Sequence, residues 1–393
     1  MDKMTIRDFP LKDRRVFLRV DFNVPLKEGT IKDDRRIRES LPTIDFLIEQ
    51  GVKLIIASHL GRPGGKVIEE MSLEPVSTRL AQLTGKKVKM APDCIGEETR
   101  RMAMSLAPGD MLLLENLRFH PEEEKNDPGF SKELACLADV YVNDAFGAAH
   151  RAHASVEGIG KFLKPCLAGF LMEKELKYLS EITGNPKHPF VTILGGAKVS
   201  DKIKLINNLL RKVDKLLIGG AMAYTFMKAQ GIPVGNSLTE EDRLELANSI
   251  LEKCREHNIQ MILPLDHIVV DDRDGEKVME TLDENIGEGR KGMDIGPKTI
   301  STFEQQIADA ETIFWNGPMG VFENDLFSEG TRKVALAIAA SKGLSVVGGG
   351  DSAAALKKFG LEEGIDHIST GGGASLEFVS GIPLPGILVL TDK

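Results

Sequence analysis

Short apolar runs alternate with amphipathic stretches from one end of the chain to the other. The runs with the length and composition of buried strands lie at residues 15–20, 53–58, 111–114, 140–142, 190–194, 215–218, 261–263, 312–315, 344–347 and 365–368. Strands that alternate with helices in this way form parallel sheets with helices on both faces. The sequence therefore predicts an α/β protein whose functional loops follow the carboxyl ends of its strands.

The length of 393 residues exceeds what one ordinary core holds and indicates two or three domains. Apolar residues recur at helical period over residues 170–183, and Gly184 and Pro186 follow as stop signals. This stretch is either a helix that joins two halves or a packing helix of one domain, and strand counting favours the first. We expect two doubly wound, Rossmann-like parallel-sheet domains joined by this helix, with a ligand cleft between them.

The formal net charge of −9 argues against nucleic acid as a partner, because no general basic field would attract it. No apolar run reaches the roughly 18 residues that span a bilayer, and the first residues are too polar for a secretory signal. We therefore expect a cytoplasmic protein with no membrane partner.

The cysteines are scattered without metal-binding spacing and are expected to be small buried residues without a role: Cys94, Cys136, Cys166 and Cys254.

Glycine-rich stretches at residues 195–196, 348–350 and 371–373 each follow a predicted strand and lead into a helix-like segment. Backbone N–H groups converge at such a helix N-terminus and bind phosphate. None of the stretches fits G-x-x-x-x-G-K-[ST], so this phosphate chemistry is not that of a P-loop.

Lys198, Asp201 and Lys202 follow the first of these glycine stretches, at a spacing that places them on one face of the first helical turns. Lysines at a helix N-terminus oppose the macrodipole, and an anionic ligand would explain them. The alternative is a surface Lys–Asp pair, which is common and costs little.

Other loops suit the remaining parts of a nucleotide. Gly219 lies among small residues that leave room for a base or a ribose. Glu323 follows the strand that leads into Asn316 and can accept a hydrogen bond from a ribose hydroxyl. Asp351, in the glycine run 348–352, is placed to hold Mg²⁺ beside phosphates.

A literal G-x-G-x-x-G at Gly287, Gly289 and Gly292 lacks the context of a dinucleotide site, because a polar stretch precedes it and no clear helix follows. We interpret it as a surface loop.

Loops in the N-terminal half each deliver an arginine or a histidine after a predicted strand. The arginine fork matches carboxylate and phosphate, so several arginines at one sheet edge form an anion cradle. Each arginine alone could be a solvated surface residue, but their convergence in an acidic protein favours the cradle. Spacing does not decide which of Arg35, Arg36 and Arg38 faces a ligand. The residues after these strands include Asp21, Asn23, Arg36, His59, Gly61, Arg62, Arg118 and Arg151.

These motifs together resemble the phosphoglycerate kinase family over essentially the whole chain. The matching stretches, in chain order, are RVDFNVP at 19–25, DDRRIR at 33–38, SHLGRP at 58–63, LENLRFH at 114–120, AHRAH at 149–153, GGAKVSDK at 195–202, WNGPMGVFE at 315–323, GGGDS at 348–352 and STGGGAS at 369–375.

The resemblance implies an ATP-dependent kinase that interconverts 1,3-bisphosphoglycerate plus ADP with 3-phosphoglycerate plus ATP. It implies a monomer with an N-terminal phosphoglycerate domain of residues 1–169 plus about 377–393, an interdomain helix at 170–184 and a nucleotide domain at 185–376. The substrate set it implies is Asp21, Phe22, Asn23, Arg36, His59, Leu60, Gly61, Arg62, Arg118 and Arg151. The nucleotide set is Lys202, Gly219, Asn316, Glu323, Gly349, Gly350, Asp351 and Ser352, with Mg²⁺ on Asp351.

The acceptor of this reaction is a carboxylate, which is ionised at neutral pH and requires no general base. We expect catalysis by positioning and charge neutralisation, with Arg36, Lys198 and backbone N–H groups near Gly372 around the migrating phosphoryl group. Direct transfer would require the two halves to close.

Two other functional classes stay open at this stage. An NAD-dependent oxidoreductase fits two α/β halves, but Asp21 and Asn23 stand where its glycine motif would follow the first strand. A non-catalytic sugar-phosphate sensor would use the arginine cradle without Lys198, Lys202 and Asp351. Neither class predicts tight binding of MgADP.

Overall fold

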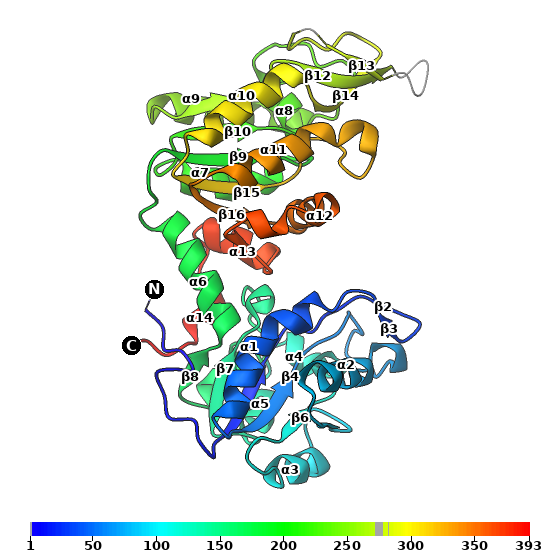
Figure 1. The fold of residues 1–393 in the computed structure, drawn as a ribbon, viewed down its shortest axis with the longest axis vertical. Coiled ribbons are helices and arrows are strands. Elements are labelled where there is room, and N and C mark those ends of the chain that lie inside the picture. The colour runs from blue at the N-terminus through cyan, green and yellow to red at the C-terminus, as the bar shows by residue number, and fades with distance from the viewer. Residues whose placement is uncertain (1, 272–277, 282) are drawn as a thin grey trace. The chain divides into compact units, whose positions relative to one another are not determined.

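The computed structural model describes residues 2–271, 278–281 and 283–393 (Figure 1). The chain forms two compact units, which we call the first and second unit. The first holds the residues up to Lys177 together with Pro383–Lys393, and the second holds Tyr178–Ile382. The boundary between them falls within helix α6, Phe170–Thr183.

The first unit is built on a six-stranded parallel sheet with the order β5-β6-β4-β1-β7-β8. Its strands are β1 Arg15–Arg19, β4 Lys53–Ala57, β5 Val88–Met90, β6 Met111–Leu113, β7 Val140–Asn143 and β8 Cys166–Ala168. A small hairpin adds β2 Leu26–Lys27 and β3 Thr30–Ile31. The helices are α1 Arg35–Glu49, α2 Glu74–Thr84, α3 Glu97–Met104, α4 Pro121–Glu124, α5 Pro128–Ala135 and α14 Pro385–Leu388.

The central strands are apolar along their length because both sheet faces are covered. Val16 and Leu18 point to the face covered by α1 and α2 and belong to one core with Ile44 and Leu80. Phe17 and Ile55 alternate to the opposite face and are also fully buried. This burial fixes the strand register, and therefore which loops meet at the carboxyl edge of the sheet.

The second unit has its own six-stranded parallel sheet, with the order β11-β10-β9-β15-β16-β17. Its strands are β9 Phe190–Leu194, β10 Lys215–Ile218, β11 Gln260–Ile262, β15 Thr312–Asn316, β16 Leu344–Gly348 and β17 His367–Ile368. Its helices are α7 Ile203–Leu209, α8 Met222–Ala229, α9 Leu244–Glu256, α10 Pro297–Ala308, α11 Glu329–Ala340, α12 Gly350–Phe359 and α13 Gly373–Val379. Helices α10, α11 and α12 cover one sheet face, where Trp315 is fully buried (Figure 1).

The predicted α/β class and the two parallel sheets are confirmed, and each predicted apolar run contains a strand. The run at 365–368 yields only the short β17. The edge strands β5 and β8 were not predicted, because three residues each carry too little pattern. A small antiparallel sheet of β12 His267–Asp271, β13 Val278–Glu280 and β14 Arg290–Ile295 was missed as well.

Two smaller predictions were wrong. Gly292 does not lie in a surface loop but inside β14, paired with Val269, and Tyr224 occupies the space where a side chain would project. Cys136 is exposed just after α5, whereas Cys94, Cys166 and Cys254 are buried as expected.

The C-terminal segment packs onto the first unit beside the N-terminal residues. The Met4 N–H donates to the Thr391 carbonyl at 2.8 Å, and the Thr391 N–H donates to the Cys166 carbonyl at 2.9 Å. The Gly386 N–H donates to the Ala149 carbonyl at 2.9 Å. Within the described residues, no helix combines the length and the apolar character needed to cross a bilayer.

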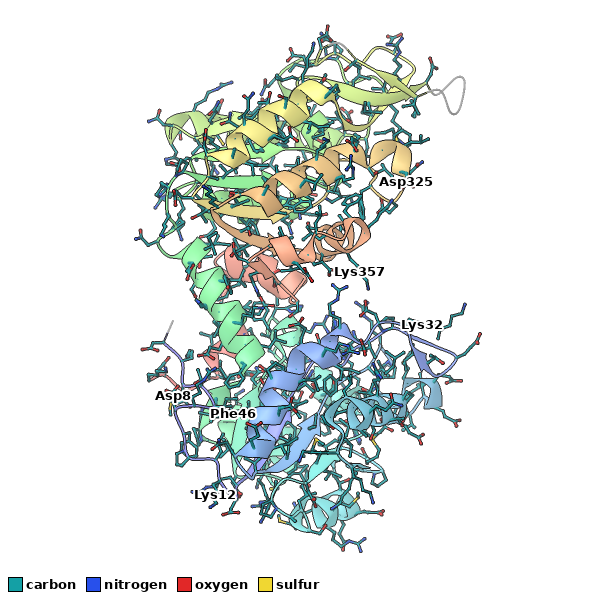
Figure 2. All side chains as sticks on the ribbon, viewed as in Figure 1. Asp8, Lys12, Lys32, Phe46, Asp325 and Lys357 are labelled. Carbon is teal, nitrogen blue, oxygen red and sulfur yellow. The ribbon has the colours of Figure 1, made fainter. Side chains whose placement is uncertain are left out.

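Helix α6 is anchored in the first unit by Asp144, which follows β7. Its carboxylate accepts the Met172 N–H at 3.0 Å, and burial raises the pKa of Asp144 to about 7. Gly169 precedes the helix, and a Cβ there would collide with this carboxylate. Phe46 of α1, labelled in Figure 2, packs on Phe170 with ring centroids 5.1 Å apart.

The raised pKa predicts how the stability of the first unit depends on pH. Between the usual value of 3.8 and about 7 the folded state holds a proton that the unfolded state has lost, so stability contributed by Asp144 falls as pH rises through this range. Asp144→Asn removes this titration. We expect the free energy of unfolding of the variant, relative to wild type, to increase by about 1–2 kcal/mol between pH 5.5 and pH 8 in urea titrations. The exposed Asp242→Asn serves as control, and an equal difference at both pH values for Asp144→Asn would refute the assignment.

Candidate active site

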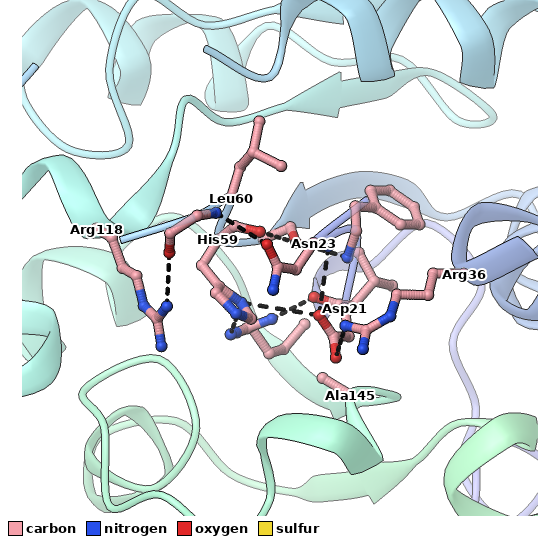
Figure 3. Close-up of polar contacts among 12 residues, drawn as sticks. Asp21, Asn23, Arg36, His59, Leu60, Arg118 and Ala145 are labelled. Atoms are coloured by element: carbon pink, nitrogen blue, oxygen red, sulfur yellow. Dashed lines mark hydrogen bonds and ion pairs between the residues drawn. The ribbon is translucent and has the colours of Figure 1, made fainter. Parts of the chain in front are cut away.

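In the first unit, the loops after β1, β4, β6 and β7 carry the predicted substrate residues, except Arg36, which lies in the first turn of α1. These strands are neighbours in the sheet, so their carboxyl-end loops meet at one edge. Figure 3 shows Asp21, Asn23, Arg36, His59, Leu60 and Arg118 gathered there.

The structure distinguishes the arginines that spacing left unresolved. Arg36 Nη1 donates to Asp21 Oδ2 at 2.6 Å, so this side chain joins the loop after β1 (Figure 3). Arg38 instead pairs with Asp34 one helical turn away, at 2.9 Å. The Arg36 side chain is 40% exposed, so part of its guanidinium group is accessible to solvent.

The loop after β4 is held by side-chain amides on both sides. Asn23 Oδ1 accepts the Gly61 N–H at 2.9 Å. Asn116 Oδ1 accepts the Leu60 N–H at 3.1 Å, and its amide donates to the Leu60 carbonyl at 2.7 Å. Arg118 Nη1 donates to the Gly61 carbonyl at 2.7 Å. The loop is therefore rigid where His59 leaves the sheet.

Phe22 and Leu60, both in the predicted substrate set, have side chains in the hydrophobic core. Only their backbone atoms are available to a polar ligand.

His59 is held as a neutral hydrogen-bond donor. Its Nδ1 lies 3.1 Å from Arg19 Nη2, and a guanidinium only donates, so Nδ1 accepts and the ring proton is on Nε2. Burial lowers the pKa of His59 well below its usual value, and the charges of Arg19 and Arg118 lower it further. At neutral pH this ring donates through Nε2–H and carries no charge.

A buried polar network behind His59 was missed in the sequence. The Arg19 side chain is 1% exposed, and its Nε donates to Ser155 Oγ at 2.9 Å. Ser155 Oγ in turn donates to Glu123 Oε1 at 2.6 Å, and the Ser155 N–H donates to Oε2 at 2.9 Å. One signal was available in the sequence: Arg19 ends an otherwise apolar central strand. A charge buried there requires hydrogen-bond partners, so polar residues near it could have been expected.

The remaining arginines of the predicted set differ in their surroundings. Arg118 is 4% exposed, and burial and the charge of Arg151 lower its pKa. Arg151 Nε lies 3.3 Å from His150 Nε2, and its charge also acts on His59. Arg62 has an exposed side chain. Arg118 Nε also pairs with Glu124 Oε1 at 3.2 Å. Because the charges of Arg118 and Arg151 both act on His59, an anion bound beside them would be favoured.

In the second unit, the predicted nucleotide residues lie on the loops after β9, β10, β15 and β16. Lys202 Nζ donates to Asn316 Oδ1, and the Asn316 amide donates to the Gly348 carbonyl at 2.7 Å. Ser352 Oγ accepts the Gly317 N–H at 2.7 Å. These bonds join Lys202, the end of β15 and the turn into α12 into one group.

Glycine is required at two of these turns. Gly349 has φ +92°, and a Cβ there would lie 2.5 Å from Asn316 Nδ2. At Gly219 a Cβ would lie 2.5 Å from Met319 Sδ, so Met319 takes part of the room expected for a base or ribose.

The charged residues predicted for the nucleotide site are more exposed than Arg19 and Arg118 of the first unit. Lys198 lies in the loop before the 3₁₀ turn Ser200–Lys202, so it does not share a helix face with Lys202 as predicted. Burial lowers the pKa of Lys202, while the charges of Asp201 and Asp351 oppose this. Asp351 is exposed in the first turn of α12, and its carboxylate oxygens suit Mg²⁺.

Glu323 and Gly372 complete the predicted set. Glu323 is exposed, and its carbonyl accepts from Lys358 Nζ at 3.2 Å. Gly372 precedes α13 with φ +49°, a conformation that glycine adopts easily.

Comparison with known proteins yields a consistent family. The family model described as "Phosphoglycerate kinase" matches residues 6–382. Curated relatives named "Phosphoglycerate kinase" include one from Chlorobium phaeobacteroides (strain BS1), 56% identical with 100% of each chain covered, and one from Moorella thermoacetica, 52% identical with the same coverage.

Solved structures agree with this result. The phosphoglycerate kinase from Coxiella burnetii superposes with a TM-score of 0.92 at 42% identity, and that from Pyrococcus horikoshii OT3 with 0.84 at 36% identity. Each alignment covers 98% of both chains. The chain belongs to the phosphoglycerate kinase family.

Proposed function

We infer that this chain is a kinase that transfers a phosphoryl group reversibly between 1,3-bisphosphoglycerate and ADP, giving 3-phosphoglycerate and ATP, a step of glycolysis and gluconeogenesis. Its family membership supports this reaction. The observation that carries it is the cluster of Arg36, Arg118 and Arg151 around His59 at one sheet edge of an acidic protein. A substrate with a carboxyl and a phosphate group matches that cluster in charge.

The first unit binds the phosphoglycerate. Arg36, Arg62, Arg118 and Arg151 would contact its anionic groups, and His59 would donate through Nε2–H. Asp21 would orient Arg36, to which it is already hydrogen bonded at 2.6 Å. The acceptor carboxylate of 3-phosphoglycerate is ionised at neutral pH, so no base has to remove a proton.

The second unit binds the nucleotide. Lys202 and the N–H groups of the turn at Gly349 and Gly350 would bind phosphate oxygens, with Ser352 fixing that turn. Gly219, Asn316 and Glu323 would line the nucleoside side. Asp351 would hold Mg²⁺, which when bound neutralises charge on the phosphates.

The transfer itself would be direct and in line, with Arg36, Lys198 and the N–H groups near Gly372 around the migrating phosphoryl group. These groups stabilise charge that develops in the transition state. Because they belong to two units, the reaction requires both to meet around the substrates and exclude water. We propose that α6, which spans the unit boundary, accommodates this hinge motion.

We also propose that the protein acts as a cytoplasmic monomer without nucleic-acid or membrane partners. The support is its family and its formal net charge of −9.

Arg36→Ala tests the transition-state role of this arginine. Loss of a positive group that acts on the migrating phosphoryl should lower kcat by about 10²–10³-fold while leaving MgADP affinity unchanged. Steady-state kinetics measures kcat, and titration calorimetry measures the MgADP affinity. Arg38→Ala is the matched control, because Arg38 pairs with Asp34, and should retain wild-type turnover. Turnover of Arg36→Ala within twofold of wild type would remove Arg36 from the reaction, and a change in KM alone would make it a binding residue only.

Titration calorimetry with MgADP tests the nucleotide site. Lys202→Ala should weaken binding by about 10–100-fold, the value of one charge-assisted contact. Lys204→Ala, on the exposed side of α7, should bind like wild type. Absence of tight MgADP binding to the wild-type protein would favour the oxidoreductase or the sugar-phosphate sensor instead.

A further inference from the structure

Three different metal-ligand side chains converge in the first unit, and none of them is among the residues assigned above to substrate. Asp93 and Cys94 lie in the loop between β5 and α3, and His120 lies between the 3₁₀ turn Leu117–Phe119 and α4. One donor atom from each of the three lies within 4.8 Å of the other two. The set offers an oxygen, a sulfur and a nitrogen.

The local structure fixes all three donors. Asp93 Oδ1 is 2.7 Å from His120 Nε2 and accepts the Cys94 N–H at 2.6 Å. The His120 ring packs on Phe130 with centroids 5.2 Å apart. Cys94 is fully buried, whereas the side chains of Asp93 and His120 are 47% and 24% exposed. Solvent therefore reaches the cluster from the side of Asp93 and His120, and the thiol lies behind them.

The electrostatic surroundings of the cluster favour a cation. Carboxylates lie close to the cluster: Asp93 Oδ1 is 2.7 Å from His120 Nε2, and Glu122 and Glu123 follow His120 in α4. A divalent ion would be attracted by these carboxylates and would replace the protons on the thiol and the imidazole.

The donor chemistry identifies the class of ion. Thiolate and imidazole are ligands of zinc and similar late divalent metals, whereas Mg²⁺ prefers oxygen. Tetrahedral zinc bonds of about 2.0–2.3 Å place ligand atoms about 3.3–3.8 Å apart. The three donor atoms all lie within 4.8 Å of one another, with Asp93 Oδ1 and His120 Nε2 at 2.7 Å, so small side-chain shifts would bring them to that range.

We propose that Asp93, Cys94 and His120 form a binding site for a zinc-like divalent cation, with a water molecule as fourth ligand. Binding breaks the Asp93–His120 hydrogen bond, releases the thiol proton and any imidazolium proton to solvent, and forms one bond from each side chain to the metal. The ion would tie the loop after β5 to the turn after β6. His120 lies two residues after Arg118, so the site adjoins the substrate loop without sharing its ligands.

Cobalt titration tests this site independently of the kinase reaction. Metal-free wild-type protein should bind one equivalent of Co²⁺ with the thiolate-to-metal absorption of a tetrahedral site, and added Zn²⁺ should abolish this signal. Cys94→Ser should lose the thiolate band, and His120→Gln and Asp93→Asn should each weaken Co²⁺ binding at least about tenfold.

Matched controls use the same residue types elsewhere in the chain. Cys136→Ser removes an exposed thiol and His257→Gln an exposed imidazole, and both should bind Co²⁺ like wild type. Asp93→Asn and His120→Gln keep the test valid if Cys94→Ser fails to fold. A wild-type protein without the thiolate band would overturn the proposal and leave an ordinary Asp–His ion pair beside a buried thiol. A band that depends on Cys136 would overturn it as well.

Discussion

Buried guanidinium groups at the carboxyl edge of the first sheet are the constraint on which the substrate side of the account depends. A charge taken out of water is tolerated only when its hydrogen bonds are satisfied. Arg19 meets this requirement through Ser155, which is bonded to the buried Glu123. Arg19 Nη1 donates to the Val20 carbonyl, and Nη2 faces His59 Nδ1 and thereby selects one tautomer of that ring. One buried ion network thus converts a titratable residue into a fixed neutral donor.

In the proposed function, the two units would bind anions in different ways. In the first unit the positive charge belongs to side chains that are held by neighbouring loops, as when Arg118 donates to the Gly61 carbonyl. In the second unit the proposed set combines side chains such as Lys202 with backbone N–H groups, at turns such as Gly349 where a Cβ would collide with Asn316. Arginine guanidinium groups suit a small substrate with a charged group at each end, whereas backbone N–H groups suit the phosphates of a nucleotide.

The parts of the fold that were predictable from sequence are the longer strands and helices, above all strands whose two faces are both buried. Central strands such as β1 and β15 read as continuous apolar runs because helices cover both faces, and α6 begins and ends at the predicted residues. Short edge strands such as β5 lack that signal. The antiparallel sheet of β12–β14 was missed for a different reason, since β12 His267–Asp271 and β14 Arg290–Ile295 mix charged with apolar residues and form no continuous apolar run.

The candidate site was predictable only where function is carried by motif residues. Residues that act through another side chain, such as Glu123 behind Arg19, gave no signal, because their partners are far away in the sequence. Packing also altered two predictions. Met319 occupies part of the space beside Gly219 that was expected for a base or a ribose, and Cys136 is exposed although it was expected to be buried. The cluster of Asp93, Cys94 and His120 could not be read from spacing, since 26 positions separate Cys94 from His120 (120 − 94) and no finger motif links them.

The most direct test of the account is the initial rate of ATP formation from 1,3-bisphosphoglycerate and MgADP by the purified protein in a coupled assay. Direct transfer should give ATP formation that requires both substrates, with one ATP for each acyl phosphate consumed. Consumption of acyl phosphate without ATP, or no turnover by protein that binds both ligands, would contradict direct transfer between the two sites.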